Sequence, residues 1–275
     1  MSATDVRSFT VGPVQENSYI VRAGVDSTRA VMVDPGEEAE RLLEAVRTLG
    51  VEIEAILITH CHFDHIGAVA EVARATGAPV YCPEIERGVL ADINSWVPPG
   101  FGPFESYEAE ETVKGGERMS IAGLDIEVLF TPGHSPGHVT YAIAASASAG
   151  EAGAAVQGGR EEDPAREGDE KGDEKGDGKG DGRVLLSGDV LFQGSVGRVD
   201  LPGGDWDVLE RSIGGLLRRF PAETVVYPGH MGTTTLGRER ETNPFLQELR
   251  VAVSKPAPGG VPDLAAREAP PTVGS

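Results

Sequence analysis

Short apolar runs and amphipathic stretches alternate along most of this chain. Short apolar runs bounded by Gly, Pro or Asn are typical of buried strands, and apolar residues spaced three and four apart are typical of helices. The expected strands are Ser8–Val11, Ser18–Arg22, Ala30–Val33, Ala55–Ile58, Val80–Tyr81, Ile126–Phe130, Thr140–Ala144, Val184–Leu186 and Val225–Tyr227. The expected helices are Glu37–Leu49, Gly67–Thr76, residues 83–91, Trp206–Phe220 and Phe245 to about Val253. This alternation predicts an α/β fold.

Three segments depart from this pattern. Residues from about 145 to 182 form an acidic, Gly-rich near-repeat without apolar periodicity, which cannot bury enough surface to offset the entropy of ordering. We therefore expect a disordered insertion within a single domain of residues 1–254, followed by a disordered tail at 255–275. The stretch Trp96–Phe104 is rich in Pro, Gly and aromatic residues. It is expected to be an irregular loop that either lines the mouth of a site or has a structural role.

The densest group of polar residues directly follows the apolar run Ala55–Ile58. It contains three of the six histidines of the chain and one carboxylate: His60, His62, Asp64 and His65. Neutral imidazoles and carboxylates are the ligands that borderline divalent metals prefer, and one ion needs about three or four of them. A solvated surface loop has no reason to use this spacing, so the sequence predicts a metal site at the carboxyl end of this strand.

Three more residues of metal-binding type follow apolar strands in the same way: His134, Asp189 and His230. A lone His or Asp after a strand is usually a turn residue or a helix cap. The strands of one sheet bring their ends close together, however, so four such loops can converge on one site. Because these loops use five of the six histidines, we expect a shared metal centre. The sixth, His138, is expected to support the ligands rather than to bind metal.

The composition narrows the possible partners and location. The chain of 275 residues has a formal charge of −20. Nucleic-acid binding needs Lys and Arg for the phosphates, so we expect no nucleic acid, and no apolar run reaches the roughly 18 residues that a membrane span needs. The chain begins without the pattern of a signal peptide, which makes the cytoplasm the expected location. The two cysteines form no disulfide framework, and Cys61 is interpreted as a space-filling residue.

The segment His60-x-His62-x-Asp64-His65 resembles the signature of the metallo-β-lactamase superfamily, a set of mostly dinuclear metallohydrolases. The resemblance implies a four-layer αββα sandwich. It also implies two divalent metal ions, with zinc expected and iron or manganese as alternatives. The implied ligands are His60, His62 and His134 for one ion, Asp64, His65 and His230 for the other, and Asp189 as a bridge. Each ion then keeps room for a hydroxide, as in an open catalytic site.

Three carboxylates have particular roles in this resemblance. Asp64 and Asp189 are the expected catalytic residues because they position the metal ions and the hydroxide, and neither is assigned as a general acid. Asp34, after the third strand, resembles the first motif of the family. It is expected to support the metal loop without binding an ion.

Three other segments resemble the hydroxyacylglutathione hydrolase (glyoxalase II) group, and in particular its shorter, single-domain bacterial members. The segments are Thr131–His138, Ser187–Arg198, and Pro228–His230 followed by Gly237–Phe245. This resemblance implies that a metal-bound hydroxide hydrolyses a small-molecule thioester of the S-lactoylglutathione type. A thiol has a pKa near about 8.5, so its thiolate leaves without a strong general acid. Glyoxalase II proper binds glutathione with a helical carboxy-terminal domain that has little counterpart here, so the thiol carrier stays open.

The same motifs leave other activities open. Persulfide dioxygenases share the fold and also resemble Thr59–His62 and Gly197–Asp200. They use a single iron bound by two histidines and a carboxylate, which would here be His62, His134 and Asp189. Hydrolysis of a lactone or a β-lactam is a further alternative, and a metal-free binding module is the alternative that is not an enzyme. We favour thioester hydrolysis, mainly because of the segment Arg238–Phe245.

Overall fold

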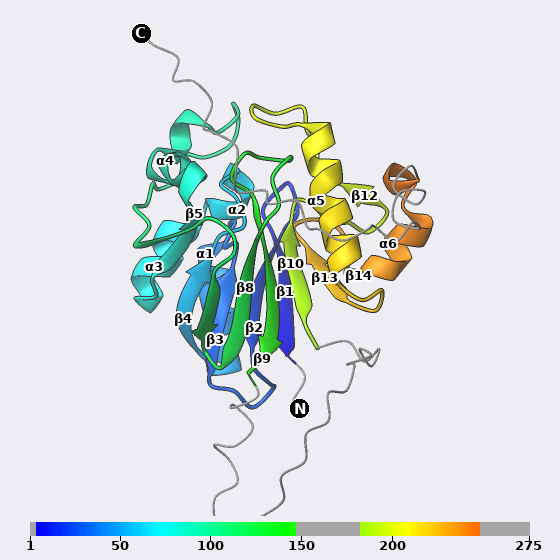
Figure 1. Cartoon of the computed structure of the whole chain (residues 1–275). Coiled ribbons are helices and arrows are strands. Elements are labelled where there is room, and N and C mark those ends of the chain that lie inside the picture. Colours follow the sequence, from blue (N-terminus) through cyan, green and yellow to red (C-terminus); the bar gives the residue numbers. More distant parts are fainter. Residues whose placement is uncertain (1–3, 147–181, 248–275) are drawn as a thin grey trace, which may run out of the picture.

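Two β-sheets face each other in the computed structural model, and helices cover the outer face of each sheet (Figure 1). The structure describes residues 4–146 and 182–247. The layers follow one another in the order helix, sheet, sheet, helix, which confirms the expected α/β sandwich. Within the described residues, no helix combines the length and the apolar character that crossing a membrane requires.

The first sheet is built from the amino-terminal part of the chain. Its strands in spatial order are β1 (Asp5–Val11), β2 (Glu16–Arg22), β3 (Arg29–Val33), β4 (Glu52–Leu57), β5 (Val80–Pro83) and β6 (Glu111–Val113). The strands β1 to β3 are antiparallel, whereas β3 to β6 run parallel. Neighbouring parallel strands end at the same edge of a sheet, so the loops that follow β3 and β4 lie side by side.

The second sheet is built from the later part of the chain. Its strands in spatial order are β14 (Thr234–Thr235), β13 (Val225–Pro228), β10 (Val184–Gly188), β9 (Val139–Ala145), β8 (Leu124–Phe130) and β7 (Arg118–Ile121). The strands β10 and β13 run parallel, so the loops that follow them leave the sheet at one edge. A small antiparallel ribbon of β11 (Leu191–Phe192) and β12 (Ser195–Val196) comes directly after β10.

The helices occupy the outer layers. They are α1 (Ala39–Leu49), α2 (Phe63–Ile66), α3 (Val69–Thr76), α4 (Arg87–Ala91), α5 (Trp206–Arg219) and α6 (Leu236–Thr242). Local signals mark their ends: Gly50 ends α1 in the left-handed conformation, and the Asp205 carboxylate caps α5 by accepting from the backbone N–H of Val208. Short 3₁₀ turns span Glu84–Glu86, Ile93–Ser95 and Pro244–Leu246.

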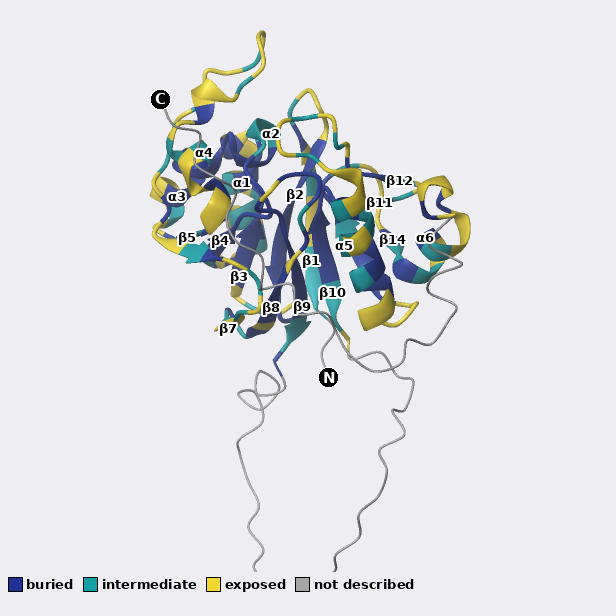
Figure 2. Cartoon of the chain, turned by 45° about the horizontal axis from the view of Figure 1, so that its top comes forward, coloured by how far each residue is buried: buried dark blue, intermediate teal, exposed yellow. Residues whose placement is uncertain are grey.

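Alternation along the strands divides the core into three apolar layers. On β2, Tyr19 and Val21 face the second sheet, whereas Ile20 faces the helices on the other side. A third layer packs α5 against the second sheet through Leu209 and Ile213. Figure 2 shows the result: the inner strands are mostly buried, whereas exposed residues lie on the helices and in the loops. The strands β1 and β7 are partly exposed.

The expected elements recur with small shifts at their ends. Each expected strand lies within or overlaps an observed one, and the four expected helices before residue 221 are present, the one at 83–91 as a 3₁₀ turn followed by α4. The main shift is in β4, which begins at Glu52 and ends at Leu57, because Glu52 and Glu54 alternate with buried residues and prolong the strand toward its start. The strands β6, β7, β11, β12 and β14 and the helices α2 and α6 had no counterpart, since such short elements carry almost no periodicity.

The remaining expectations fall on three segments. Residues 96–104 form an irregular loop as expected, and the rings of Phe101 and Phe104 lie 4.8 and 6.0 Å from the ring of Phe63. The expected insertion at about residues 145–182 lies outside the described residues, apart from its first two residues and its last. The expected tail at 255–275 also lies outside them. The expected helix from Phe245 to Val253 is described only as far as residue 247.

Candidate metal centre

Four loops bring the predicted ligands together at one end of the two sheets. The loop after β4 carries His60, His62, Asp64 and His65, and the loops after β8, β10 and β13 carry His134, Asp189 and His230. All seven side chains lie close to one another in the structure. The strands β8, β10 and β13 run in the same direction, so the loops that follow them leave the second sheet at one edge. The order of the strands therefore brings the ligand loops together.

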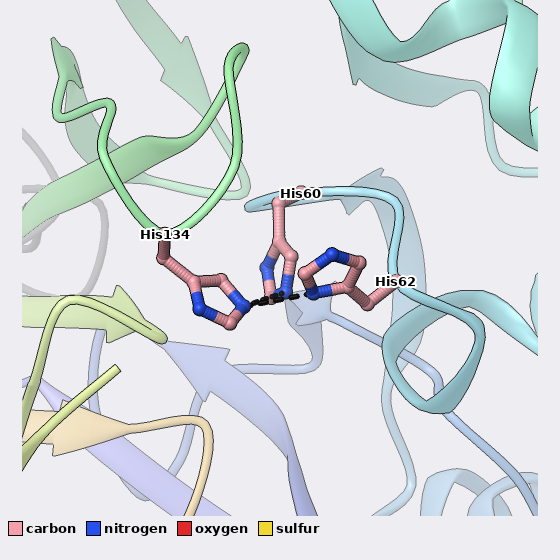
Figure 3. Close-up of side chains that lie close together, drawn as sticks. All are labelled: His60, His62 and His134. Atoms are coloured by element: carbon pink, nitrogen blue, oxygen red, sulfur yellow. Dashed lines mark hydrogen bonds between the residues drawn. The ribbon is translucent and has the colours of Figure 1, made fainter. Parts of the chain in front are cut away.

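The first triad consists of His60, His62 and His134. His62 Nδ1 lies 2.8 Å from His134 Nε2, and His134 Nε2 lies 3.2 Å from His60 Nε2. Figure 3 shows the three rings turned toward one another. Three ring nitrogens that meet at one point repel each other unless a proton or a cation lies between them, and three imidazoles are a common ligand set for zinc.

The second triad consists of Asp64, His65 and His230. His230 Nε2 lies 3.3 Å from Asp64 Oδ2, and His65 Nε2 lies 4.0 Å from the same oxygen. The three ligand atoms all lie within 4.8 Å of one another. One carboxylate oxygen and two imidazole nitrogens form a second ligand set of the kind that divalent metals bind.

Asp189 lies between the two triads. Its Oδ2 atom is 3.5 Å from His134 Nε2 of the first triad and 3.5 Å from His230 Nε2 of the second. Its Oδ1 atom is 3.3 Å from His65 Nε2. A single carboxylate therefore reaches the ligand atoms of both triads, which is the geometry of a bridging ligand.

The donor set fits divalent metal ions. His65 Nε2 and Asp189 Oδ1 are buried and face each other without making a hydrogen bond. A buried polar atom without a partner costs about 1–3 kcal/mol, so a native structure normally gives such an atom a ligand. A metal ion held by these two residues would remove this cost. Five imidazoles and two carboxylates suit zinc or iron better than magnesium or calcium, which prefer oxygen ligands.

Backbone carbonyls fix two of the imidazoles from behind. His134 Nδ1 donates to the carbonyl of Arg198 at 2.7 Å. His230 Nδ1 donates to the carbonyl of Gln15 at 3.2 Å. Each bond sets the tautomer of its ring, so the Nε2 lone pair points into the site and is available to a metal ion.

Asp34 holds the start of the metal loop. Its carboxylate accepts from the backbone N–H and the hydroxyl of Thr59, at 2.7 and 2.6 Å, and from His65 Nδ1 at 3.0 Å. Its backbone adopts a left-handed conformation with φ of 46°, which Asp tolerates better than most residues. The ligand atoms of Asp34, His60 and His65 also lie within 4.8 Å of one another. Both oxygens of the Asp34 carboxylate already accept hydrogen bonds, so a supporting role for Asp34 stays our expectation.

His138 contacts two of the predicted ligand residues without facing the ligand atoms: it binds the backbone of Asp189, and its ring stacks on that of His60 with centroids 4.9 Å apart. Its Nε2 atom accepts from the backbone N–H of Asp189 at 3.1 Å, and its Nδ1 atom lies 3.1 Å from the hydroxyl of Thr131. Both ring nitrogens thus have protein partners. Among the described residues, no cluster of metal-type ligand atoms includes His138. This geometry fits support of the bridging carboxylate without ligation.

Burial and charge set the protonation of the site. Burial lowers the pKa of His60 well below its usual range, and burial with the neighbouring His134 lowers the pKa of His62 to about 4. These imidazoles are therefore neutral, the form that binds metal. Burial acts against the charge of Asp189, but His65 outweighs it and lowers the pKa of that carboxyl. Burial acts against the charge of His65 as well, but Asp189 outweighs it and raises the pKa of that imidazole.

A glycine permits the close approach of the last loop. A Cβ atom at Gly229 would lie 2.2 Å from Asp189 Oδ1 and 2.6 Å from His65 Cε1. Any side chain at this position would therefore push His230 away from the other ligands. The Pro-Gly-His order of this loop is thus a consequence of crowding at the site.

The loop that carries His230 is also held by a buried residue of the first sheet. The side-chain amide of Asn17 donates to the carbonyls of Pro228 and Met231, at 3.1 and 2.9 Å. Asn17 is almost fully buried, and the Tyr19 hydroxyl also donates to the carbonyl of Pro228 at 2.6 Å. No local sequence pattern indicates this role of Asn17, since its partners lie more than 200 positions away.

The segment Arg238–Phe245 has a structural explanation. The buried Glu239 accepts from the backbone N–H of Gly194, and Asn243 donates to the carbonyl of Ser195. Gly194 lies in the turn of the β11–β12 ribbon, and Ser195 begins β12. This ribbon leads to Arg198 and hence to the carbonyl that binds His134. No sequence pattern indicated this contact, because the segment and the ribbon lie more than forty positions apart.

A comparison with protein families decides the classification. The family model described as Metallo-beta-lactamase superfamily matches residues 11–169 and 178–230, which is most of the chain. The chain belongs to the metallo-β-lactamase superfamily. This result confirms the family that the histidine motif indicated. It also supports an enzyme of the metallohydrolase type.

Relatives within the superfamily differ in what their names describe. The hydroxyacylglutathione hydrolase GloC of Haemophilus influenzae is 28% identical over 80% of this chain and 89% of its own length. The solved structure of BLEG-1, named a B3 metallo-beta-lactamase, has a TM-score of 0.70 and 34% identity, with 88% of this chain and all of that chain covered. The structure of TTHA1623 in a di-iron-bound form has a TM-score of 0.60 and 36% identity, with coverage of 87% and 100%.

Proposed function

We propose that this member of the superfamily is a dinuclear metal-dependent hydrolase that cleaves a small-molecule thioester of the hydroxyacylglutathione type. The observation that carries the proposal is the position of Asp189 between two complete triads. A centre for one ion needs only one triad. The second set of ligand atoms and the unpartnered oxygen of Asp189 therefore favour two ions over one.

The residues supply binding and orientation. When bound, two divalent ions act as Lewis acids and lower the pKa of a water to about 7. Asp189 and Asp64 bring negative charge to the site and offset part of the positive charge of the ions. His134 and His230 are fixed by backbone carbonyls, so that the ligand positions change little when substrate enters.

The thioester class is supported by the leaving group and by a relative. A thiol has a pKa near about 8.5, so a thiolate leaves at neutral pH without a strong general acid. This requirement matches a site made of metal ligands, in which we assign no carboxylate as an acid. The name of GloC describes hydrolysis of hydroxyacylglutathione, and this chain is similar to GloC over most of its length.

Hydrolysis of a β-lactam is the second candidate. The similarity to BLEG-1 favours it, because that structure aligns over its whole length at 34% identity and that protein is named a metallo-beta-lactamase. The chemistry of the two candidates differs in the leaving group. An amide nitrogen must be protonated as it leaves, whereas a thiolate need not be.

The test is a comparison of substrates on metal-replete protein. We expect hydrolysis of S-lactoylglutathione without oxygen, followed as loss of thioester absorbance, and much slower turnover of a chromogenic cephalosporin. Asp189→Asn is the matched control, since it keeps the shape of the side chain and removes its charge. Uptake of oxygen with glutathione persulfide, together with no hydrolysis of the thioester, would instead indicate a dioxygenase. That alternative expects a single bound iron, so two bound ions by elemental analysis would count against it.

The metal content needs its own measurement. We propose two ions per chain and favour zinc. Iron is the alternative, because the similar structure of TTHA1623 is in a di-iron-bound form. Elemental analysis after expression in medium supplemented with each metal gives both identity and number. A single ion at saturation would contradict the dinuclear proposal.

A further inference from the structure

Glu86 connects two of the loops that form the metal centre. It lies at the end of the 3₁₀ turn Glu84–Glu86, and only 5% of its surface is exposed. Its Oε2 atom accepts from the backbone N–H of Cys61 at 2.5 Å. Its Oε1 atom accepts from the hydroxyl of Ser135 and from the backbone N–H of Gly137, the latter at 2.8 Å.

The three donors belong to the loops of the first triad. Cys61 lies between His60 and His62, and Ser135 directly follows His134. One carboxylate thus receives a hydrogen bond from each of the two loops that deliver the first triad. Hydrogen bonds to a charged acceptor are roughly twice as strong as neutral ones, and the contribution is larger in a buried position.

The second triad is held by other groups. His65 is bound by Asp34, and His230 is bound by the carbonyl of Gln15. No hydrogen bond from Glu86 reaches Asp34 or the loop of His230 among the described residues. A change at Glu86 therefore acts first on the spacing between His134 and the two histidines of the β4 loop.

We infer that Glu86 is a positioning residue that sets the geometry, and hence the metal affinity, of the first triad but not of the second. The inference rests on the metal centre of the proposed function and is independent of the substrate. The carboxylate holds the loops at the separation that brings three ring nitrogens to one point. Its effect reaches an ion through the loops alone.

Glu86→Gln is the informative substitution. An amide of the same shape has one accepting oxygen and one NH₂ group, which only donates. In either orientation the NH₂ group faces a donor, namely the N–H of Cys61 or the pair of Ser135 and Gly137. The variant therefore fills the same space but loosens one of the two loops.

Glu127→Gln is the matched control. Glu127 is also a nearly buried carboxylate, and it pairs with Arg219 at 2.7 Å and Arg118 at 3.3 Å. The same substitution there removes charge-assisted contacts without touching a ligand loop. It reports how far a general loss of stability alone changes metal binding.

The measurement is a titration of metal-free protein with zinc against a chromophoric chelator. We expect Glu127→Gln to bind two ions with the same two affinities as wild type. Glu86→Gln should bind one ion as tightly as wild type and the other about 10- to 100-fold more weakly. Equal weakening of both ions, or unchanged binding of both, would overturn the inference. If Glu86→Gln does not fold, Ser135→Ala removes one donor alone and should weaken the binding of the same single ion. Unchanged metal binding in Ser135→Ala would equally overturn the inference.

The outcome separates this inference from the proposed function. A wild-type protein that binds two ions but does not hydrolyse S-lactoylglutathione would defeat the thioester assignment and leave the role of Glu86 standing. If wild type hydrolyses the thioester while Glu86→Gln binds metal like wild type, the proposed function stands and the inference about Glu86 fails.

Discussion

Ile143 on β9 is the register partner of Val184 on β10. The chain therefore leaves the second sheet and returns to it at adjacent points, and residues 147–181 join these two points. Strand β10 runs from Val184 toward Asp189, so the junction lies at the end of the sheet opposite the metal centre. Two antiparallel neighbours need only a short turn between them.

We expect deletion of residues 150–180 to leave the protein folded and active. The loops that carry the ligands begin at the other ends of β9 and β10, so their positions do not depend on this connection. Metal content should remain at the wild-type value, and the rate of thioester hydrolysis should stay within about twofold, because connection length has little effect on a packed sheet. Elemental analysis and a steady-state assay check this, and insoluble or metal-free protein would show that the segment belongs to the domain.

Substitution of the two histidines of the β8–β9 loop should have different effects. His134→Ala removes a ligand, so we expect the loss of one of two ions and a fall in turnover of at least about a hundredfold. His138→Ala removes the acceptor for the N–H of Asp189 and the ring that stacks on His60, but no ligand atom, so both ions should remain while turnover falls about 10- to 100-fold. Elemental analysis with the thioester assay distinguishes the two, and loss of an ion in His138→Ala would assign it to the metal.

Cys61 should be dispensable for metal binding. Its side chain is buried in the layer between the first sheet and the helices, with Sγ at 3.5 Å from Cys82 Sγ. Among the described residues it belongs to no cluster of metal-type ligand atoms. Cys61→Ala should therefore keep both ions and lose roughly 1 kcal/mol of stability, as expected for a small buried truncation. Reduced metal content in a folded Cys61→Ala protein would make the thiol a ligand.

The ion pair of Glu127 and Arg219 predicts a dependence of stability on pH. Burial acts against the charge of Glu127, but Arg219 and Arg118 outweigh it and lower the pKa of this carboxyl below its ordinary value of 4.5. Such a carboxyl stabilises the fold above its unfolded pKa, and this contribution disappears as pH falls through the folded pKa.

In wild type, the urea midpoint should therefore fall more steeply between about pH 5 and pH 3 than in Glu127→Gln, which has no proton to bind at this position. The comparison uses urea titrations of both proteins at matched pH. Parallel curves would show that the pair contributes nothing, as many surface ion pairs do.

Much of the metal centre could be predicted from the sequence. His60, His62, Asp64 and His65 stand within six positions, and each remaining ligand directly follows a strand with a clear apolar run. Strand order then brings these loops together, because the strands of a sheet are placed by backbone hydrogen bonds. The family resemblance adds an expectation that spacing alone does not give, namely which of these residues would share an ion.

The supporting contacts could not be predicted in this way. Glu86 binds Cys61 and Ser135, which are 25 and 49 positions away, and Asn17 binds a loop more than 200 positions away. Such partners are set by tertiary packing and leave no local periodicity. The same holds for β14 and the β11–β12 ribbon, whose two-residue strands are too short for any alternation to be visible.

The composition of the triads has a consequence for the whole molecule. Each triad draws two ligands from the loop after β4, in the first sheet, and its third from a loop of the second sheet. Two bound ions would therefore act as cross-links between the halves of the sandwich, and each would raise the unfolding free energy by an amount that grows with free metal concentration. In a cell short of metal, the halves would part first at this end, where proteases find the exposed loops. The abundance of the protein would then follow the supply of metal.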